Sequence, residues 1–157
     1  MKLNLAKFII SIVICQLAGV LGSLFTIPKI PGWYASLNKP AFAPPSWVFG
    51  PVWVALYILM GISLYLVWNR GIKGKGEKMA VYLFGVQLAL NALWSFLFFG
   101  LESPFYGLAG IVLMWLAILA TMWKFYVIDR RAAFLLVPYI AWVSLAALLN
   151  YSVWALN

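Results

Sequence analysis

Histidine is absent from this sequence, and acidic residues and cysteine are almost absent. The 157 residues include no His, three Asp or Glu and a single cysteine, Cys15. Without histidine the chain lacks the commonest general base and a common zinc or haem ligand. One cysteine excludes an intrachain disulfide. The three acidic residues lie outside the long apolar runs, so the sequence does not favour hydrolytic or metal-assisted catalysis, and it indicates no required cofactor.

Charge of either sign is scarce. Hydrophobic residues make up 66% of the chain, charged residues 9%, and the mean hydropathy is +1.01. Soluble domains contain about 25% charged residues, so we expect this chain to lie in a membrane. Apolar runs of about 20 residues are long enough to span a bilayer as helices. The prediction is an all-α integral membrane protein, a single five-transmembrane-helix bundle over residues 1–157, with spans at 8–27, 47–68, 79–99, 105–125 and 132–154. Pro138 is expected to kink the fifth span.

The basic residues lie at the ends of the spans, which does not favour nucleic-acid binding. Only Lys29 and Lys39 fall on one predicted side of the membrane. The positive-inside rule therefore predicts a cell-membrane protein with a cytoplasmic amino terminus and its carboxyl terminus outside. The bases on the other side are Lys2, Lys7, Arg70, Lys73, Lys75, Lys78, Lys124, Arg130 and Arg131.

The first connection is rich in proline and aromatic residues. Pro40, Pro44 and Pro45 fix φ and remove backbone donors, so we expect a stiff, extended loop from Trp33 to Ser46. Pro51 is expected within the first turn of the helix that follows. A position at the membrane interface, where aromatic residues are common, accounts for each tryptophan taken alone. It does not account for the prolines, and we interpret the loop as the cap of a pocket.

Polar and aromatic side chains share helix faces inside three spans. Gln87, Asn91 and Ser95 repeat every four residues on the third span, and Trp94 follows Asn91 by three. Two interpretations remain open. The amides bond neighbouring helices, or they join the indoles in a mostly apolar pocket for a flat organic ligand. Similar faces carry Trp53, Tyr57, Met60 and Gly61 on the second span, and Trp142, Ala146, Leu149 and Asn150 on the fifth.

The third span also carries a pair of small residues that lets helices approach closely. Gly85 and Ala89 are four residues apart, which predicts a homodimer through this helix. The alternative is that both face the interior of the bundle.

Four motifs in consistent order resemble the tryptophan-rich sensory protein/translocator protein (TspO/MBR) family. They read WYASLNKP, APPSWVFGPVW, QLALNALWSFLFFG and VPYIAWVSLAALLNYSVW, and the match runs from about Gly22 to Trp154. Phe42 stands where the family commonly has tryptophan. The resemblance implies a five-helix bundle that binds porphyrins, such as protoporphyrin IX and haem, and similar flat hydrophobic ligands. The ligand-contacting positions that it implies are Tyr34, Pro44, Trp53, Asn91, Trp94, Trp142, Ala146 and Leu149, with weaker local matches at Gly22, Ser23 and Tyr106.

Three functions are compatible with these patterns. The first is a membrane binding protein, sensor or carrier for porphyrins. The second, implied by some relatives, is an enzyme that degrades porphyrins with light or oxygen through Trp53 and Trp142. The third is a small-molecule transporter, which the absence of charges within the spans and of internal repeats does not favour.

The absence of histidine also predicts how a porphyrin is recognised. We expect stacking on Trp53, Trp94 and Trp142 and a charge pair from Lys39, none of which depends on a central metal. Eukaryotic members of the family resemble cholesterol binders through a leucine–tyrosine–basic pattern at the end of the last helix. This chain has Tyr151 there without a following Lys or Arg, so sterol binding is not favoured.

Overall fold

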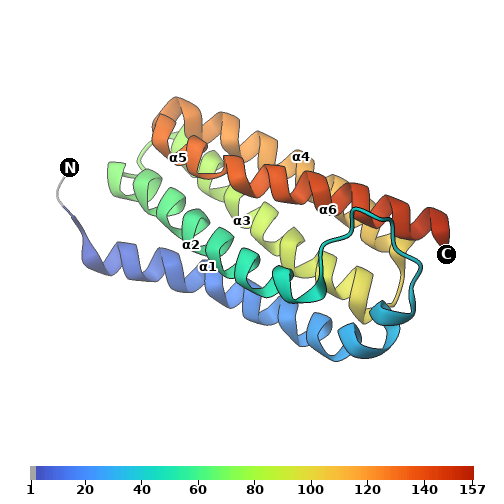
Figure 1. The fold of residues 1–157 in the computed structure, drawn as a ribbon. Coiled ribbons are helices and arrows are strands. Elements are labelled where there is room, and N and C mark those ends of the chain that lie inside the picture. Colours follow the sequence, from blue (N-terminus) through green and yellow to red (C-terminus); the bar gives the residue numbers. More distant parts are fainter. Residues whose placement is uncertain (1–2) are drawn as a thin grey trace.

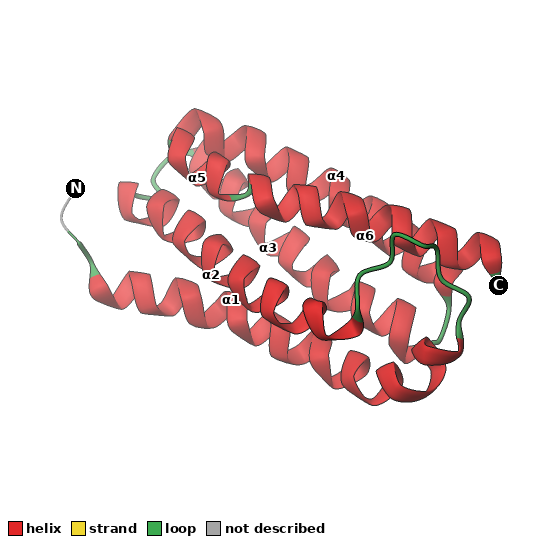
Figure 2. Cartoon of the chain, viewed as in Figure 1, coloured by secondary structure: helices red, strands yellow, loops and turns green. Residues whose placement is uncertain are grey.

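The computed structural model describes residues 3–157, and Lys2, one of the predicted amino-terminal bases, lies outside them. All regular structure in residues 3–157 is helical (Figure 1, Figure 2). Five helical segments in this range are long and apolar enough to cross a membrane, which confirms the predicted fold class. They are Leu5–Tyr34, Ser46–Arg70, Lys75–Gly100, Pro104–Ile128 and Arg130–Leu156.

The first membrane helix changes its winding as it approaches the loop. α1 (Leu5–Thr26) passes into a 3-10 turn, η1 (Ile27–Lys29), and then into a π turn, η2 (Ile30–Tyr34). Pro28 and Pro31 have no N–H to donate, so a regular α-helical ladder cannot continue through this stretch. The altered turns nevertheless keep the chain helical as far as Tyr34.

The first loop is therefore shorter than predicted. Trp33 and Tyr34 belong to η2, and the irregular stretch runs only from Leu37 to Pro45. α2 (Ser46–Arg70) begins at Ser46. Pro51 is its sixth residue and lies in the second turn, not in the first as predicted. The prolines do exclude helix from the middle of the loop, but Trp33 and Tyr34 before it remain helical.

The remaining chain forms three more membrane helices. α3 (Lys75–Ser95) ends in a π turn, η3 (Phe96–Gly100), and α4 (Pro104–Ile128) follows a short turn. The fifth membrane helix is divided into α5 (Arg130–Leu135) and α6 (Val137–Leu156).

The division of the fifth helix is the distortion predicted for Pro138. Leu136 lies between α5 and α6, and Pro138 is the second residue of α6. Proline is tolerated at the start of a helix because the first N–H groups have no intrahelical acceptor. The chain therefore places Pro138 where its missing donor costs little.

The helices pack around a space that α2 leaves partly open. α1 packs against α2 and α3, while α4 packs against α3, α5 and α6. α5 also contacts α2 and so closes the bundle at the end that carries the amino terminus. Contacts of α2 with α3 and α6 are sparse. This sparse packing leaves room between these helices in the other half of the molecule.

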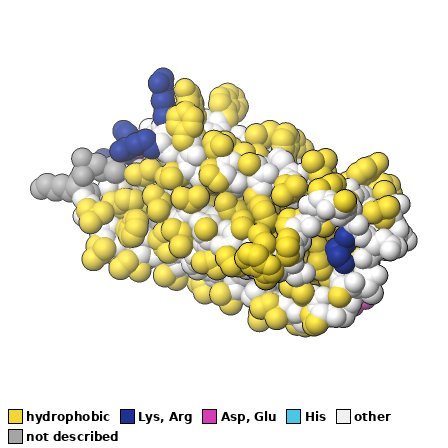
Figure 3. Space-filling model, in the orientation of Figure 1, with side chains coloured by type: hydrophobic (Ala, Val, Ile, Leu, Met, Phe, Trp, Pro, Cys, Tyr) yellow, Lys and Arg dark blue, Asp and Glu magenta, His cyan; other side chains and the backbone are white. Residues whose placement is uncertain are grey.

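The two ends of the bundle differ in charge. Basic side chains gather mainly at the end near the amino terminus, and apolar side chains cover much of the face shown in Figure 3. We call this the basic end, and the opposite end, with the Leu37–Pro45 loop, the loop end. Asp129 at the basic end pairs with Arg70 and Arg131. Its charge therefore ties the end of α2 to the turn between α4 and α5.

Candidate functional site

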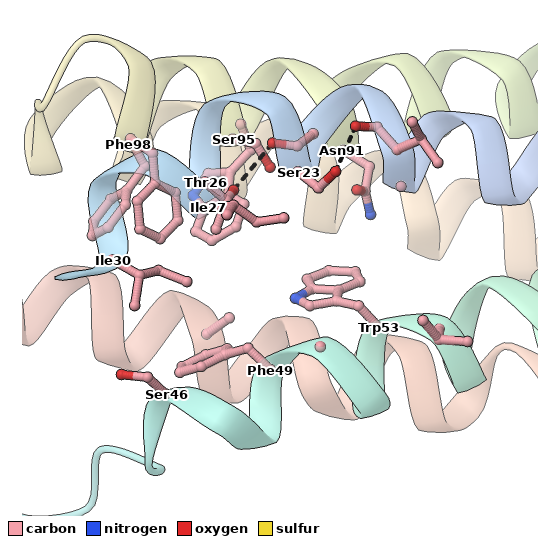
Figure 4. A pocket seen from close by; sticks show the side chains of 18 of the residues that line it. Ser23, Thr26, Ile27, Ile30, Ser46, Phe49, Trp53, Asn91, Ser95 and Phe98 are labelled. Carbon is pink, nitrogen blue, oxygen red and sulfur yellow. Dashed lines mark hydrogen bonds between the residues drawn. The ribbon is translucent and has the colours of Figure 1, made fainter.

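A cavity of about 300 Å³ lies between the helices in the loop-end half of the bundle (Figure 4). Ligand pockets in proteins measure roughly 300–1,000 Å³, so this one is at the small end of that range. Its lining is mostly apolar, and none of the described residues that form it is charged. The walls come from the first membrane helix, the first turns of α2, α3 with η3, and α6.

Eight of the twelve positions predicted for ligand contact line this cavity. Although far apart in the sequence, they meet because the helices pack side by side. They are Gly22, Ser23, Tyr34, Trp53, Asn91, Trp94, Ala146 and Leu149.

Three predicted positions lie away from the cavity wall. Pro44 is half-buried in the loop, and Tyr106 is 55% exposed on the outside of α4. Trp142 contacts Phe49, which does line the cavity, with 5.8 Å between their ring centroids. The indole Nε1 of Trp142 is buried and has no hydrogen-bond acceptor among the described residues. In this arrangement Phe49 therefore stands between Trp142 and the cavity.

Lys39 is the fourth predicted position that does not line the cavity. Its Nζ donates to the carbonyl oxygens of Tyr34, at 2.7 Å, and of Leu37, at 3.0 Å. The same ammonium lies 4.7 Å from the centroid of the Tyr34 ring. A cation at the carboxyl end of a helix stabilises the last carbonyl groups. Lys39 thus holds the end of η2 in place, and the charge pair from Lys39 to a porphyrin stays a prediction.

Tyr34 offers the cavity a hydrogen bond that the protein does not use. The residue is 4% exposed, and its ring packs among Phe49, Phe98 and Phe99. The hydroxyl is buried without a partner among the described residues. A buried, unsatisfied hydroxyl costs roughly 1–3 kcal/mol. An acceptor atom on a ligand would relieve this cost.

Trp53 offers a second donor. Figure 4 shows its indole nitrogen turned into the space between α1 and α2. The indole stacks on Tyr57, with 5.6 Å between centroids and 27° between planes, and meets Tyr139 edge-on. These contacts fix the ring, so its N–H is held in one direction without a protein acceptor among the described residues.

Trp94 contributes a flat wall but no free donor. Its Nε1 donates to the Asn150 Oδ1 atom at 3.1 Å, and its ring stacks on Phe98 at 5.6 Å. The Asn150 amide in turn donates to the Pro104 carbonyl at 2.7 Å. This chain of bonds joins α3, α6 and the start of α4 behind the cavity.

A second chain of hydrogen bonds lies beneath the cavity. The Tyr57 hydroxyl donates to Asn91 Oδ1 at 2.6 Å, and Asn91 Nδ2 donates to the Tyr139 hydroxyl at 2.9 Å. The Tyr139 hydroxyl donates to Gln87 Oε1 at 2.8 Å. Both amides therefore bond neighbouring helices, as one interpretation proposed, and Asn91 also lines the cavity. Gln87 bonds a neighbouring helix but does not line the cavity.

Sequence reasoning missed most of the wall that the first helix contributes. Apart from Gly22 and Ser23, this wall includes Gly19 and Thr26. These four small residues follow the i, i+3, i+4, i+7 spacing of one helix face, and that stripe was the available signal. The aromatic residues Phe49, Phe98 and Phe99 were also missed, because phenylalanine in an apolar run carries no distinguishing pattern.

Comparisons with known proteins agree on one family. A sequence model of the TspO/MBR family matches residues 11–155. The chain is 46% identical over 145 residues to the tryptophan-rich protein TspO of Chlorobaculum tepidum, covering 92% of this chain and 91% of that protein. It is 38% identical over 157 residues to the tryptophan-rich sensory protein of Cereibacter sphaeroides, covering 100% and 95%. It is 43% identical over 138 residues to the translocator protein of Homo sapiens, covering 87% and 81%.

Proposed function

The chain belongs to the TspO/MBR family and is a multi-pass integral membrane protein, and on this premise we propose that it binds porphyrins and similar flat hydrophobic ligands in the cavity. Protoporphyrin IX and haem are the porphyrins meant here. Two relatives are named for sensing and for translocation, so the proposed role is that of a sensor or carrier. No cofactor is required for such a role.

The observation that carries this proposal is the pair of unused donors in an uncharged cavity. The Tyr34 hydroxyl is buried without a partner among the described residues, and the Trp53 indole nitrogen is turned into the space between α1 and α2 (Figure 4). Apolar and aromatic walls with a few directed polar groups are typical of small-molecule sites. Such a cavity suits a neutral, flat ligand region with carbonyl or ring-nitrogen acceptors.

The size and neutrality of the cavity also determine how a porphyrin would lie. A tetrapyrrole is large for a space of about 300 Å³, so we expect one edge of the macrocycle to insert while the cavity widens. The porphyrin carboxylates would stay at the mouth, because burying an unpaired charge in the uncharged lining is costly.

Titration with protoporphyrin IX tests the proposal directly. We expect saturable binding by the wild type and a loss of about tenfold or more in Trp53→Ala, which removes both wall and donor. Tyr34→Phe keeps the ring and removes only the hydroxyl, so a smaller loss is expected. Trp123→Ala is the control, because Trp123 is 68% exposed on α4 and far from the lining. Equal affinity in all four proteins would place the binding site elsewhere.

Three further measurements separate this proposal from its alternatives. Protoporphyrin IX and haem should bind within about tenfold of each other, because stacking does not depend on the metal. A haem preference of about a hundredfold would instead indicate an iron ligand in the protein. Loss of the porphyrin absorption band with repeated turnover would favour the degrading enzyme. Flux across proteoliposomes would favour the transporter.

A further inference from the structure

The cavity is not enclosed on every side. Val20 and Ile27 of the first membrane helix line it, yet their side chains are 55% and 65% exposed on the molecular surface. Val54 on α2 lines it and is 52% exposed. Ser46 and Gly50 continue this exposed rim along α2. The cavity therefore opens sideways between α1 and α2.

This opening is bounded toward the basic end of the bundle. Gln16 Nε2 donates to the Val54 carbonyl at 3.3 Å and so bridges α1 and α2. Next to this bridge, Tyr57 lies against Gly19 so closely that a Cβ there would be 2.5 Å from the ring. α1 and α2 touch at the level of Gly19 and Tyr57, and they separate only between this level and the loop end.

Hydrogen bonds tie the loop to the carboxyl end of α6. The Asn38 N–H donates to the Asn157 Oδ1 atom at 3.0 Å, and Asn157 Nδ2 donates to the Asn38 carbonyl at 3.0 Å. Asn157 Nδ2 also donates to the Val153 carbonyl at 2.8 Å, which fixes it to the end of α6. We call these three bonds the loop clasp. Below the loop, the buried Tyr34 ring closes the loop end of the cavity.

We propose that the opening between α1 and α2 is a lateral portal through which neutral hydrophobic ligands pass directly between the bilayer and the cavity. This inference rests on the proposed ligand-binding function. Val20 lies near the middle of the first membrane helix, so the part of the rim at Val20 lies within the apolar part of the bilayer. A ligand dissolved in lipid would meet only apolar side chains and small residues at the rim. It would reach the cavity without crossing water or breaking the loop clasp.

Gly50 allows the portal to be narrowed without disturbing the fold. A Cβ built at Gly50 meets nothing within 4 Å, so Gly50→Leu places its side chain in open space at the rim. With the protein in phosphatidylcholine vesicles and protoporphyrin IX as the probe, quenching of tryptophan emission reports the exchange rates. We expect the association and dissociation rate constants to fall together by about tenfold, with the dissociation constant changed by less than about threefold.

Two matched controls accompany this variant. Gly76→Leu also meets open space but lies at the basic end, and we expect wild-type rates for it. Asn157→Ala breaks the loop clasp, and we expect wild-type rates again, because the ligand does not pass the loop.

The outcomes against the portal are distinct from a failure of binding itself. Wild-type rates in Gly50→Leu, or rates raised about tenfold in Asn157→Ala, would overturn the portal in favour of passage through the loop. A folded wild type with no saturable quenching amplitude would overturn the proposed function, and the portal with it. Because amplitude and rate are read from the same traces, the two failures cannot be confused.

Discussion

Among single residues outside the membrane spans, Asp129 has a carboxyl group whose pKa its neighbours lower markedly. Its side chain is only 2% exposed. Arg70 Nε donates to it at 2.9 Å, and the Arg131 guanidinium donates to both carboxylate oxygens, at 3.2 and 3.0 Å. The hydrogen bonds from Arg131, followed by those from Arg70, lower the pKa of this carboxyl from 3.8 to about 2, against the opposing effect of burial.

This lowered pKa makes a pH-dependent prediction. A carboxylate with a lowered folded-state pKa stabilises the protein fully above about pH 4, and its contribution is lost as the pH falls toward about 2. Asp129→Asn keeps an acceptor for the Arg131 backbone N–H at 3.0 Å but removes the charge. We expect it to cost about 1–2 kcal/mol at neutral pH. Thermal unfolding in detergent should show the two proteins converging between about pH 4 and pH 2. A constant difference across that range would contradict the assignment.

Trp53 and Trp142, both predicted as ligand contacts, should differ in their effects. Trp53 lines the cavity, whereas Trp142 lies behind Phe49. Trp53→Phe should therefore weaken a flat aromatic ligand that carries a carbonyl group by about 1–3 kcal/mol if its acceptor stays buried. Trp142→Phe should change the same affinity by less than about threefold.

Equilibrium titration with the two variants checks this order. A larger loss in Trp142→Phe would show that Phe49 swings aside when the ligand binds. Phe49→Ala then serves as the follow-up, because it uncovers Trp142 without changing either indole.

At the scale of the helices, close approach of α1 and α2 depends on Gly61. A Cβ at this position would lie 2.7 Å from the Ile12 Cα, a backbone atom that can move only if the helices separate. We expect Gly61→Ala to lower stability by about 1–3 kcal/mol, measured as a lower unfolding midpoint by circular dichroism in detergent. Gly85→Ala is the matched control, because its Cβ meets nothing within 4 Å and alanine is the better helix former. Equal midpoints would refute the tight crossing.

The exposed side of α3 supports the proposed homodimer. Gly85 and Ala89 both lie on its outer face, with Tyr82 and Leu93 above and below, so they do not face the bundle interior. A pair of small residues on a lipid-facing helix allows close packing with a second helix. We expect Gly85→Leu to shift the protein from dimer to monomer in sedimentation velocity in detergent, while Gly76→Leu leaves it unchanged. A dimer that survives Gly85→Leu would place the interface elsewhere.

At the scale of the whole molecule, the charge difference between the two ends predicts its orientation. Of the described bases, only Lys29 and Lys39 lie toward the loop end, and Lys29 is paired with Glu102. We propose that the basic end faces the cytoplasm and the loop end faces outward, in the cell membrane.

Single cysteines in a Cys15→Ala background test this orientation. Ser36 and Gly74 are exposed at opposite ends of the bundle, and the native Cys15 is buried. A membrane-impermeant maleimide should label Ser36→Cys on intact cells and Gly74→Cys only after permeabilisation. The reverse pattern would invert the proposed orientation, and equal labelling on intact cells would contradict it.

The sequence by itself determined the number of helices, their order and their membrane character. It also predicted the distortion near Pro138 and the shared face of Gln87, Asn91 and Ser95, all of which are buried on α3. These features depend on the length, hydropathy and spacing of residues within one helix. Such properties are local, because a bilayer requires each span to satisfy its own backbone hydrogen bonds.

Only the tertiary structure decided which side chains reach the cavity. Trp53 and Trp142 look alike in sequence, but α2 turns Trp53 into the cavity while Phe49 shields Trp142. Lys39 bonds the carbonyl of Tyr34, a contact that the sequence did not predict, and Tyr34 itself belongs to a helix and not to the loop. These outcomes depend on how each helix is rotated about its axis and on which side chain fills the space between neighbours. Packing among several helices sets both, and no single run of residues contains that information.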